Sequence, residues 1–106
     1  MSKACELIFT GKMIDAQEAL RLGIVSDLVE PDELMNAVRT LAGEIAAGPP
    51  IAIRLARRAM YRNMDCELRE ALEFETHAQN ICRESEDSKE GVKAFVEKRS
   101  PEFKGR

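Results

Sequence analysis

The stretch DCELREALEFETHAQNICR, residues 65–83, carries the longest apolar pattern at helical spacing that we identify in the sequence. Asp65 is a residue type that caps helix N-termini, so we expect the helix to begin there. The apolar positions fall on more than one side of this helix, at Leu68, Ala71, Leu72, Phe74, Ala78, Ile81 and Cys82. A helix that is apolar on several sides needs more than one neighbour. This stretch therefore predicts a protein built mainly from packed α-helices.

Further helices are predicted on both sides of this stretch. Asp15 and Glu18 form a capping box at the start of one short helix, and Gly23 is its expected stop. Beyond residue 99 the chain is expected to be a loose tail. The other expected helices run over residues 2–9, from Pro31 to the break at Gly48-Pro49-Pro50, over 51–64 and over 90–99.

One segment is predicted to be a strand. Residues 24–30, IVSDLVE, are rich in β-branched side chains, too short for a helix, and bounded by Gly23 and Pro31. A single strand cannot satisfy its backbone hydrogen bonds, and the sequence offers no second candidate. We therefore expect this unpaired strand to find its partner on another chain or on a missing segment, as part of a larger fold or an obligate assembly.

Composition limits the class of protein. The 106 residues fit one compact unit, and 16 Lys and Arg against 19 Asp and Glu give a net charge of −3, which argues against general nucleic-acid binding. The start lacks the apolar core of a signal peptide, and no apolar run is long enough for a membrane span, so we expect a cytoplasmic protein without membrane contact. Cys5, Cys66 and Cys82 are too few and too scattered for a disulfide framework, and we expect them to be reduced and buried.

No residue set points to catalysis or metal binding. His77 is the single histidine, and neither a nucleophile nor an orienting acid has a local signature beside it. Its five-residue separation from Cys82 does not place the two well on one helix face for metal binding. The glycines form no phosphate-binding loop. The remaining carboxylates are expected to be a solvated helix face: Glu67, Glu70, Glu73 and Glu75.

A helix-turn-helix DNA-binding hypothesis rests on the helix over 51–64. It follows the Gly48-Pro49-Pro50 break and carries four arginines, at positions 54, 57, 58 and 62. Acidic residues follow at once, and basic positions on an exposed helix face are more often solvated than bound to phosphate. The charge pattern therefore favours a solvated helix face over DNA binding.

Two motifs carry a family resemblance. Residues 6–25, ELIFTGKMIDAQEALRLGIV, and residues 85–103, SEDSKEGVKAFVEKRSPEF, resemble segments of the enoyl-CoA hydratase/isomerase (crotonase) family, as does Pro50-Ile51-Ala52 before an arginine-bearing helix. The match is collinear and indicates the C-terminal region. It implies that residues 1–30 are the last turn of the family's ββα spiral, which would explain the unpaired strand. Residues 31–106 would form the helical lid and trimer-building region, together one structural unit with 1–30.

The resemblance also implies what this chain lacks. The family stabilises an enolate of an acyl-CoA thioester in an oxyanion hole of two backbone amides, and its carboxylates move protons. All these elements lie upstream of residue 1, so we expect no catalytic residue here and no activity of the chain alone. No metal or further cofactor is implied; coenzyme A enters as part of the substrate and would bind only with the missing core.

Phe95 and Lys98 are the candidate binding residues, because their counterparts in the family approach the adenine and phosphate groups of coenzyme A. An aromatic face suits adenine and an ammonium suits phosphate. Core packing beside Val92 and Val96 is the alternative for Phe95, and a cationic helix terminus is the alternative for Lys98 and Arg99. Self-association is the expected partnership, and a stand-alone helical interaction module is the alternative function.

Overall fold

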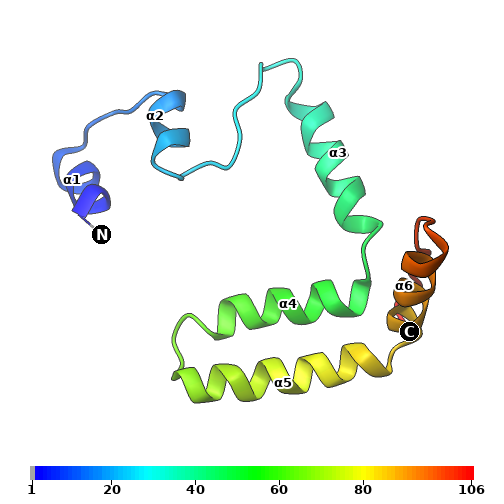
Figure 1. Ribbon diagram of the computed structural model, residues 1–106. Helices are drawn as coiled ribbons and strands as arrows, with labels where there is room; N and C mark the ends of the chain where they lie inside the picture. The colour runs from blue at the N-terminus through cyan, green and yellow to red at the C-terminus, as the bar shows by residue number, and fades with distance from the viewer. Residues whose placement is uncertain (1) are drawn as a thin grey trace. The chain divides into compact units, whose positions relative to one another are not determined.

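The computed structural model describes residues 2–106, and within them the chain is helical (Figure 1). The expected helices are found, and the mainly α fold class is confirmed. One unit of the chain ends at Val38 and the other covers Arg39–Arg106. The helices are α1 (Ser2–Thr10), α2 (Ala16–Arg21), α3 (Leu34–Ala46), α4 (Pro50–Arg62), α5 (Leu68–Glu84) and α6 (Glu86–Glu97).

The first two helices, α1 and α2, confirm their predicted boundaries. The Asp15 carboxylate accepts a hydrogen bond from the Glu18 amide at 2.8 Å and so caps α2. The Glu18 side chain does not close the capping box, because both of its oxygens bond the Arg21 guanidinium at 2.6 Å. Gly11 and Gly23 follow α1 and α2 with φ of 63° and 71°, values that favour glycine.

The predicted strand over 24–30 is wrong. Within residues 2–106 no strand forms, and this segment is a series of bends followed by irregular chain. The Leu28 amide bonds its neighbour Asp27 at 2.7 Å instead of a ladder partner. The β-branched composition favours extended backbone, but a strand needs a second one beside it, and the described chain supplies none.

The second unit is held together by α4, α5 and α6. Helices α4 and α5 lie side by side and α6 packs against α5 (Figure 1). The buried apolar residues are small, with Ala59 of α4 exposed by 5%, Ala78 of α5 by 7% and Ala94 of α6 by 1%. Alanine at a helix contact lets two backbones approach closely. The apolar pattern of residues 65–83 therefore does have two neighbours in α4 and α6.

Three helix starts differ from the prediction, and the first is that of α3, which begins at Leu34 and not at Pro31. Helix α5 begins after Glu67, which makes no side-chain cap, so Asp65 is not its N-cap. Helix α6 begins directly after Ser85 and not at residue 90. The Ser85 hydroxyl accepts from the Ser88 amide at 3.1 Å and donates to the Cys82 carbonyl at 2.7 Å. One serine therefore ends α5 and starts α6, which leaves no room for a loop.

The tail after residue 99 is bound, and the expectation of a loose tail is wrong. Asp87, exposed by only 4%, accepts from the Lys104 amide at 2.7 Å and from the Gly105 amide at 2.8 Å. The Arg106 carbonyl accepts from the Glu86 amide at 2.7 Å. This amide lies in the first turn of α6, where amides have no acceptor within the helix. The tail thus runs back to the start of α6 (Figure 1).

Large apolar side chains remain exposed in both units. No side chain described in the first unit is buried, and Phe9 and Met13 are exposed by 81% and 92%. In the second unit Leu68, Leu72 and Phe95 are exposed by 57% to 85%. Exposed apolar surface of this extent is typical of interaction surfaces.

Candidate functional site

The C-terminal end of α6 carries both predicted binding residues. Phe95 is 85% exposed, and its neighbours Val92 and Val96 are exposed by 65% and 73%. The side of α6 that faces the core carries Ala94 and Asp87 instead. Phe95 therefore contributes nothing to the core of this chain, and its ring is open to a ligand or a further protein surface.

Lys98 ends α6 in a left-handed conformation, with φ of 53° and ψ of 41°. Its amide donates to the Phe95 carbonyl at 3.3 Å, and the next amide, that of Arg99, donates to the Ala94 carbonyl at 3.1 Å. Both bonds close the last turn of the helix and satisfy carbonyls that would otherwise be unpaired. The structure thus places Phe95 and Lys98 at the same exposed helix end.

Arg99 is the centre of an ion-pair cluster beside Lys98. Its guanidinium contacts the two Glu90 oxygens at 2.6 and 3.0 Å and a Glu97 oxygen at 2.7 Å. The Glu102 amide adds a bond of 3.0 Å to Glu90. The Arg99 hydrogen bond, with a smaller contribution from the Glu102 amide, lowers the pKa of Glu90 from 4.5 to about 2.

The carboxylates also raise the pKa of the Arg99 guanidinium, with its hydrogen bond to Glu90 as the largest cause and that to Glu97 next. The Arg99 guanidinium is therefore already bonded to carboxylates of this chain. Lys98 is exposed, and no ion pair of its side chain is found among residues 2–106. Of the two cations at this helix end, the ammonium of Lys98 is the one available to an anion.

Sequence reasoning missed Asp87 as the residue that orders this region. Its carboxylate binds the tail, and Phe103 of that tail covers Gly91, where an added Cβ would lie 3.6 Å from the ring. The serine and two acidic residues at 85–87 could have indicated an earlier helix start, since these types cap and open helices. Asp87 binds backbone amides of the tail. Because almost every residue has such an amide, the residue types in the tail do not reveal this contact.

The carboxylates predicted to be a solvated helix face lie at the surface, as expected: Glu67, Glu70, Glu73 and Glu75. His77 is exposed as well. The three cysteines are free and partly buried. Across residues 2–106, no group of three or more His, Cys, Asp or Glu side chains could hold a metal ion. None of the helices in that range is both long enough and apolar enough to cross a membrane.

The arginine face of α4 lines an open hollow of 690 Å³. Two of its arginines are engaged by α5, because the guanidinium groups of Arg58 and Arg62 lie 5.7 and 5.2 Å from the centre of the Phe74 ring. Arg62 also pairs with Glu70, and Arg57 lies 5.4 Å from the Tyr61 ring. Much of this positive charge therefore serves packing between α4 and α5.

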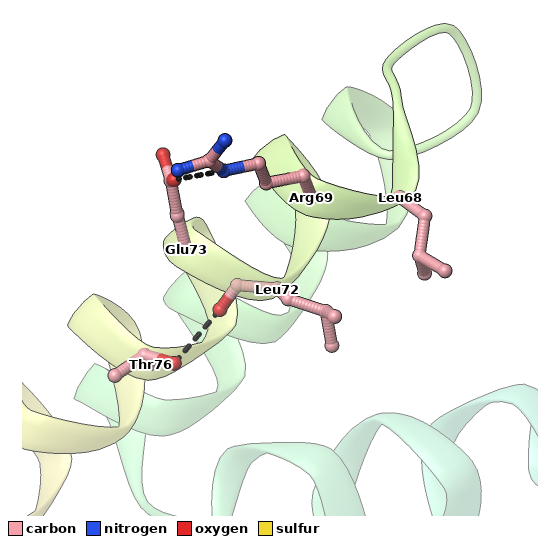
Figure 2. A pocket seen from close by; sticks show the side chains of 5 residues that line it. All are labelled: Leu68, Arg69, Leu72, Glu73 and Thr76. Carbon is pink, nitrogen blue, oxygen red and sulfur yellow. Dashed lines mark hydrogen bonds and ion pairs between the residues drawn. The ribbon is translucent and has the colours of Figure 1, made fainter.

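A second open hollow, of 640 Å³, lies along α5 alone (Figure 2). Leu68 and Leu72 point to one side of the helix, and Arg69 and Glu73 pair on another with Nε and Oε1 3.3 Å apart. Thr76 donates to the Leu72 carbonyl at 2.8 Å. Because a single helix lines it, this hollow is an uncovered apolar face and not an enclosed pocket.

Comparison with known proteins places the whole chain in one family. The family model described as enoyl-CoA hydratase/isomerase matches residues 1–106. A short-chain-enoyl-CoA hydratase of Clostridium acetobutylicum is 45% identical over 107 residues, which cover 100% of this chain and 41% of that protein. A crotonyl-CoA hydratase of Syntrophomonas wolfei is 37% identical, over 94% of this chain and 40% of that protein.

Solved structures agree with the sequence matches. An enoyl-CoA hydratase of Bacillus anthracis superimposes with a TM-score of 0.94 at 38% identity, covering 100% of this chain and 41% of that one. Subunit I of an enoyl-CoA hydratase from Geobacillus kaustophilus gives 0.90 at 42% identity, with the same coverage. The chain thus spans about two fifths of the length of these relatives. From the two motifs, the helical fold and these matches together, the chain belongs to the enoyl-CoA hydratase/isomerase family.

Proposed function

We propose that this chain acts as the C-terminal helical part of an enoyl-CoA hydratase or isomerase, and that Phe95 and Lys98 contact the coenzyme A portion of the substrate. The observation that carries the proposal is the open helix end of α6, where an aromatic ring 85% exposed and an exposed ammonium lie three residues apart. Coenzyme A offers an adenine ring to the first and phosphates to the second.

The reaction itself is assigned to residues outside this chain. Hydration or isomerisation of an enoyl-CoA needs donors aimed at the thioester oxygen and a carboxylate placed to move protons. Three carboxylates of α6 are engaged otherwise, since Glu90 and Glu97 bind Arg99 and Asp87 binds the tail. We therefore expect the 106 residues alone to be inactive and to bind acyl-CoA only together with a catalytic core.

Assembly is the second part of the proposed role. The uncovered apolar face of α5, with Leu68 and Leu72, and the exposed side chains of the first unit would be covered by the rest of the enzyme and by further copies of this chain. We propose a cytoplasmic location, which the three free cysteines support. We assign no nucleic-acid or membrane partner and no further cofactor.

The direct test is a fusion protein. Residues 1–106 replace the matching residues of the Clostridium acetobutylicum short-chain-enoyl-CoA hydratase, and hydration of crotonyl-CoA is measured. We expect the fusion to hydrate crotonyl-CoA and the 106-residue chain alone to show no turnover. Substitution Phe95→Ala or Lys98→Ala should raise KM, whereas His77→Ala, in an exposed helix position, serves as the control. Turnover by the chain alone, or KM values unaltered by both substitutions, would contradict the proposal.

A stand-alone helical interaction module remains the alternative, and the uncovered face of α5 is the observation that favours it. The two functions differ in what Leu72→Glu does. In a module it abolishes capture of a partner by the isolated chain, while in an enzyme part it prevents assembly of the fusion protein and with it the hydration of crotonyl-CoA.

A further inference from the structure

The end of α6 differs from the ends of the two short helices in the first unit. α1 and α2 are each followed by a glycine in the left-handed region, Gly11 and Gly23. Glycine is the usual residue there because it has no Cβ to collide with the following carbonyl. At the end of α6 the same conformation falls on Lys98, the one non-glycine residue with a positive φ among residues 2–106.

A lysine in this conformation carries a conformational cost that glycine avoids. The surrounding groups hold it there. The Arg99 amide bonds the Ala94 carbonyl at 3.1 Å, and the Arg99 guanidinium bridges Glu97 on one side of Lys98 and Glu90 two turns of helix earlier. It also donates to the Ser100 carbonyl at 3.1 Å. Both chain neighbours of Lys98 are therefore fixed by one ion-pair cluster.

For the packing of this chain, a glycine at the position of Lys98 would serve equally well. Lys98 is exposed, and no hydrogen bond or ion pair of its ammonium is found in the described residues. The left-handed strain is therefore stored at a residue whose ammonium is open to a group outside the chain.

We infer that Lys98 is held in a strained turn so that its ammonium is presented at the same helix end as Phe95, and that Arg99, clamped by Glu90 and Glu97, is the positioning residue for it. The anion it takes is a phosphate group of a nucleotide-like ligand, and this inference rests on the proposed coenzyme A contact. Arg99 itself does not touch the ligand. Its role is to fix the backbone from which Lys98 reaches out.

The strain is tested on the 106-residue chain by urea denaturation of Lys98→Gly and Lys98→Ala. Both variants lack the ammonium, but only glycine relieves the left-handed turn. We expect the folding equilibrium constant of Lys98→Gly to exceed that of Lys98→Ala by about three- to tenfold. Equal stability of the two variants would overturn the strain part of the inference, whatever the binding data show.

The presentation of the ammonium is tested in the fusion protein with crotonyl-CoA. Both Lys98 variants should raise KM by about tenfold, the loss expected for one charge-assisted contact. An unaltered KM would refute the coenzyme A contact while leaving the stability result standing, so the two failures are distinguishable.

The positioning role of Arg99 is tested by a double-mutant cycle with Arg99→Met. In the parent fusion this substitution should raise KM several-fold, and in the Lys98→Gly background it should have no further effect, because no ammonium is left to position. A purely structural Arg99 would raise KM equally in both backgrounds, and that result would overturn the positioning role. The Lys98 backbone NMR shifts should move away from left-handed values in Arg99→Met.

Discussion

Substitution Asp87→Asn tests whether the buried carboxylate holds the tail on α6. Each carboxylate oxygen accepts one backbone amide, that of Lys104 at 2.7 Å and that of Gly105 at 2.8 Å. Asparagine keeps one acceptor and turns an NH₂ group toward the other amide, so one charge-assisted bond, typically ~1.5–3 kcal/mol, is lost. The first turn of α6 also loses a negative charge, worth ~0.3–1 kcal/mol. We expect the free energy of unfolding to fall by about 2–4 kcal/mol.

Urea denaturation followed by circular dichroism measures this loss, and hydrogen exchange of the Lys104 and Gly105 amides locates it. Glu86→Gln is the matched control, because the neighbouring carboxylate is 65% exposed and its ion pair with Arg106, at 2.8 Å, is worth ~0–1 kcal/mol. Exchange of the two tail amides should accelerate in Asp87→Asn only. If both variants lose the same stability, or if the tail amides exchange at parental rates, then the tail is not held by Asp87.

Three further predictions concern the second unit, each measured by urea denaturation. Gly91→Ala should stabilise the chain by ~0.5–1 kcal/mol, because its Cβ would meet the Phe103 ring at an ordinary 3.6 Å and alanine favours the helix; a loss of stability would refute this packing. Gly48→Ala should change the free energy of unfolding by no more than ~1 kcal/mol, because Ile53 Cδ1, 2.8 Å from the added Cβ, is the end of a flexible side chain and can move aside, while the Ile45 carbonyl oxygen lies at 3.3 Å; a loss above ~3 kcal/mol would contradict this. The pKa of Glu90, lowered from 4.5 to about 2, stabilises the fold above pH 4.5, and this contribution is lost as pH falls toward 2. Glu90→Gln should therefore flatten the decline of stability between these pH values, and an unaltered slope would contradict the assignment.

The helices could be predicted because their signals are local. The Asp15 cap, the glycine stops at Gly11 and Gly23 and the break at residues 48–50 depend on neighbours within one turn of chain. The family also followed from sequence, since both motifs are contiguous. The first turn of α6 was missed because Gly91 lowers helix propensity, and the packing of Phe103 on Gly91 that accompanies it is not visible locally.

The tail and the strand were predicted wrongly for a common reason. Each depends on a partner far along the chain or outside it. The tail has one in Asp87, 17 residues before Lys104, and is ordered. The segment 24–30 has none among the described residues and stays irregular despite its β-branched composition. Composition alone could not distinguish the two cases, because backbone hydrogen bonding leaves no residue signature on the partner.

The apolar side chains and the polar contacts of this chain have different consequences for the proposed site. The apolar side chains, such as Leu72, stay open until something covers them, so their stabilising effect depends on assembly. Helix α6 is instead fixed at both ends by polar groups of this chain, with Arg99 between Glu90 and Glu97 at its C-terminal end and the tail on Asp87 in its first turn. A binding residue that is ordered before its ligand arrives loses less conformational entropy on binding. In the proposed enzyme, Lys98 would then be in place before assembly completes the rest of the site.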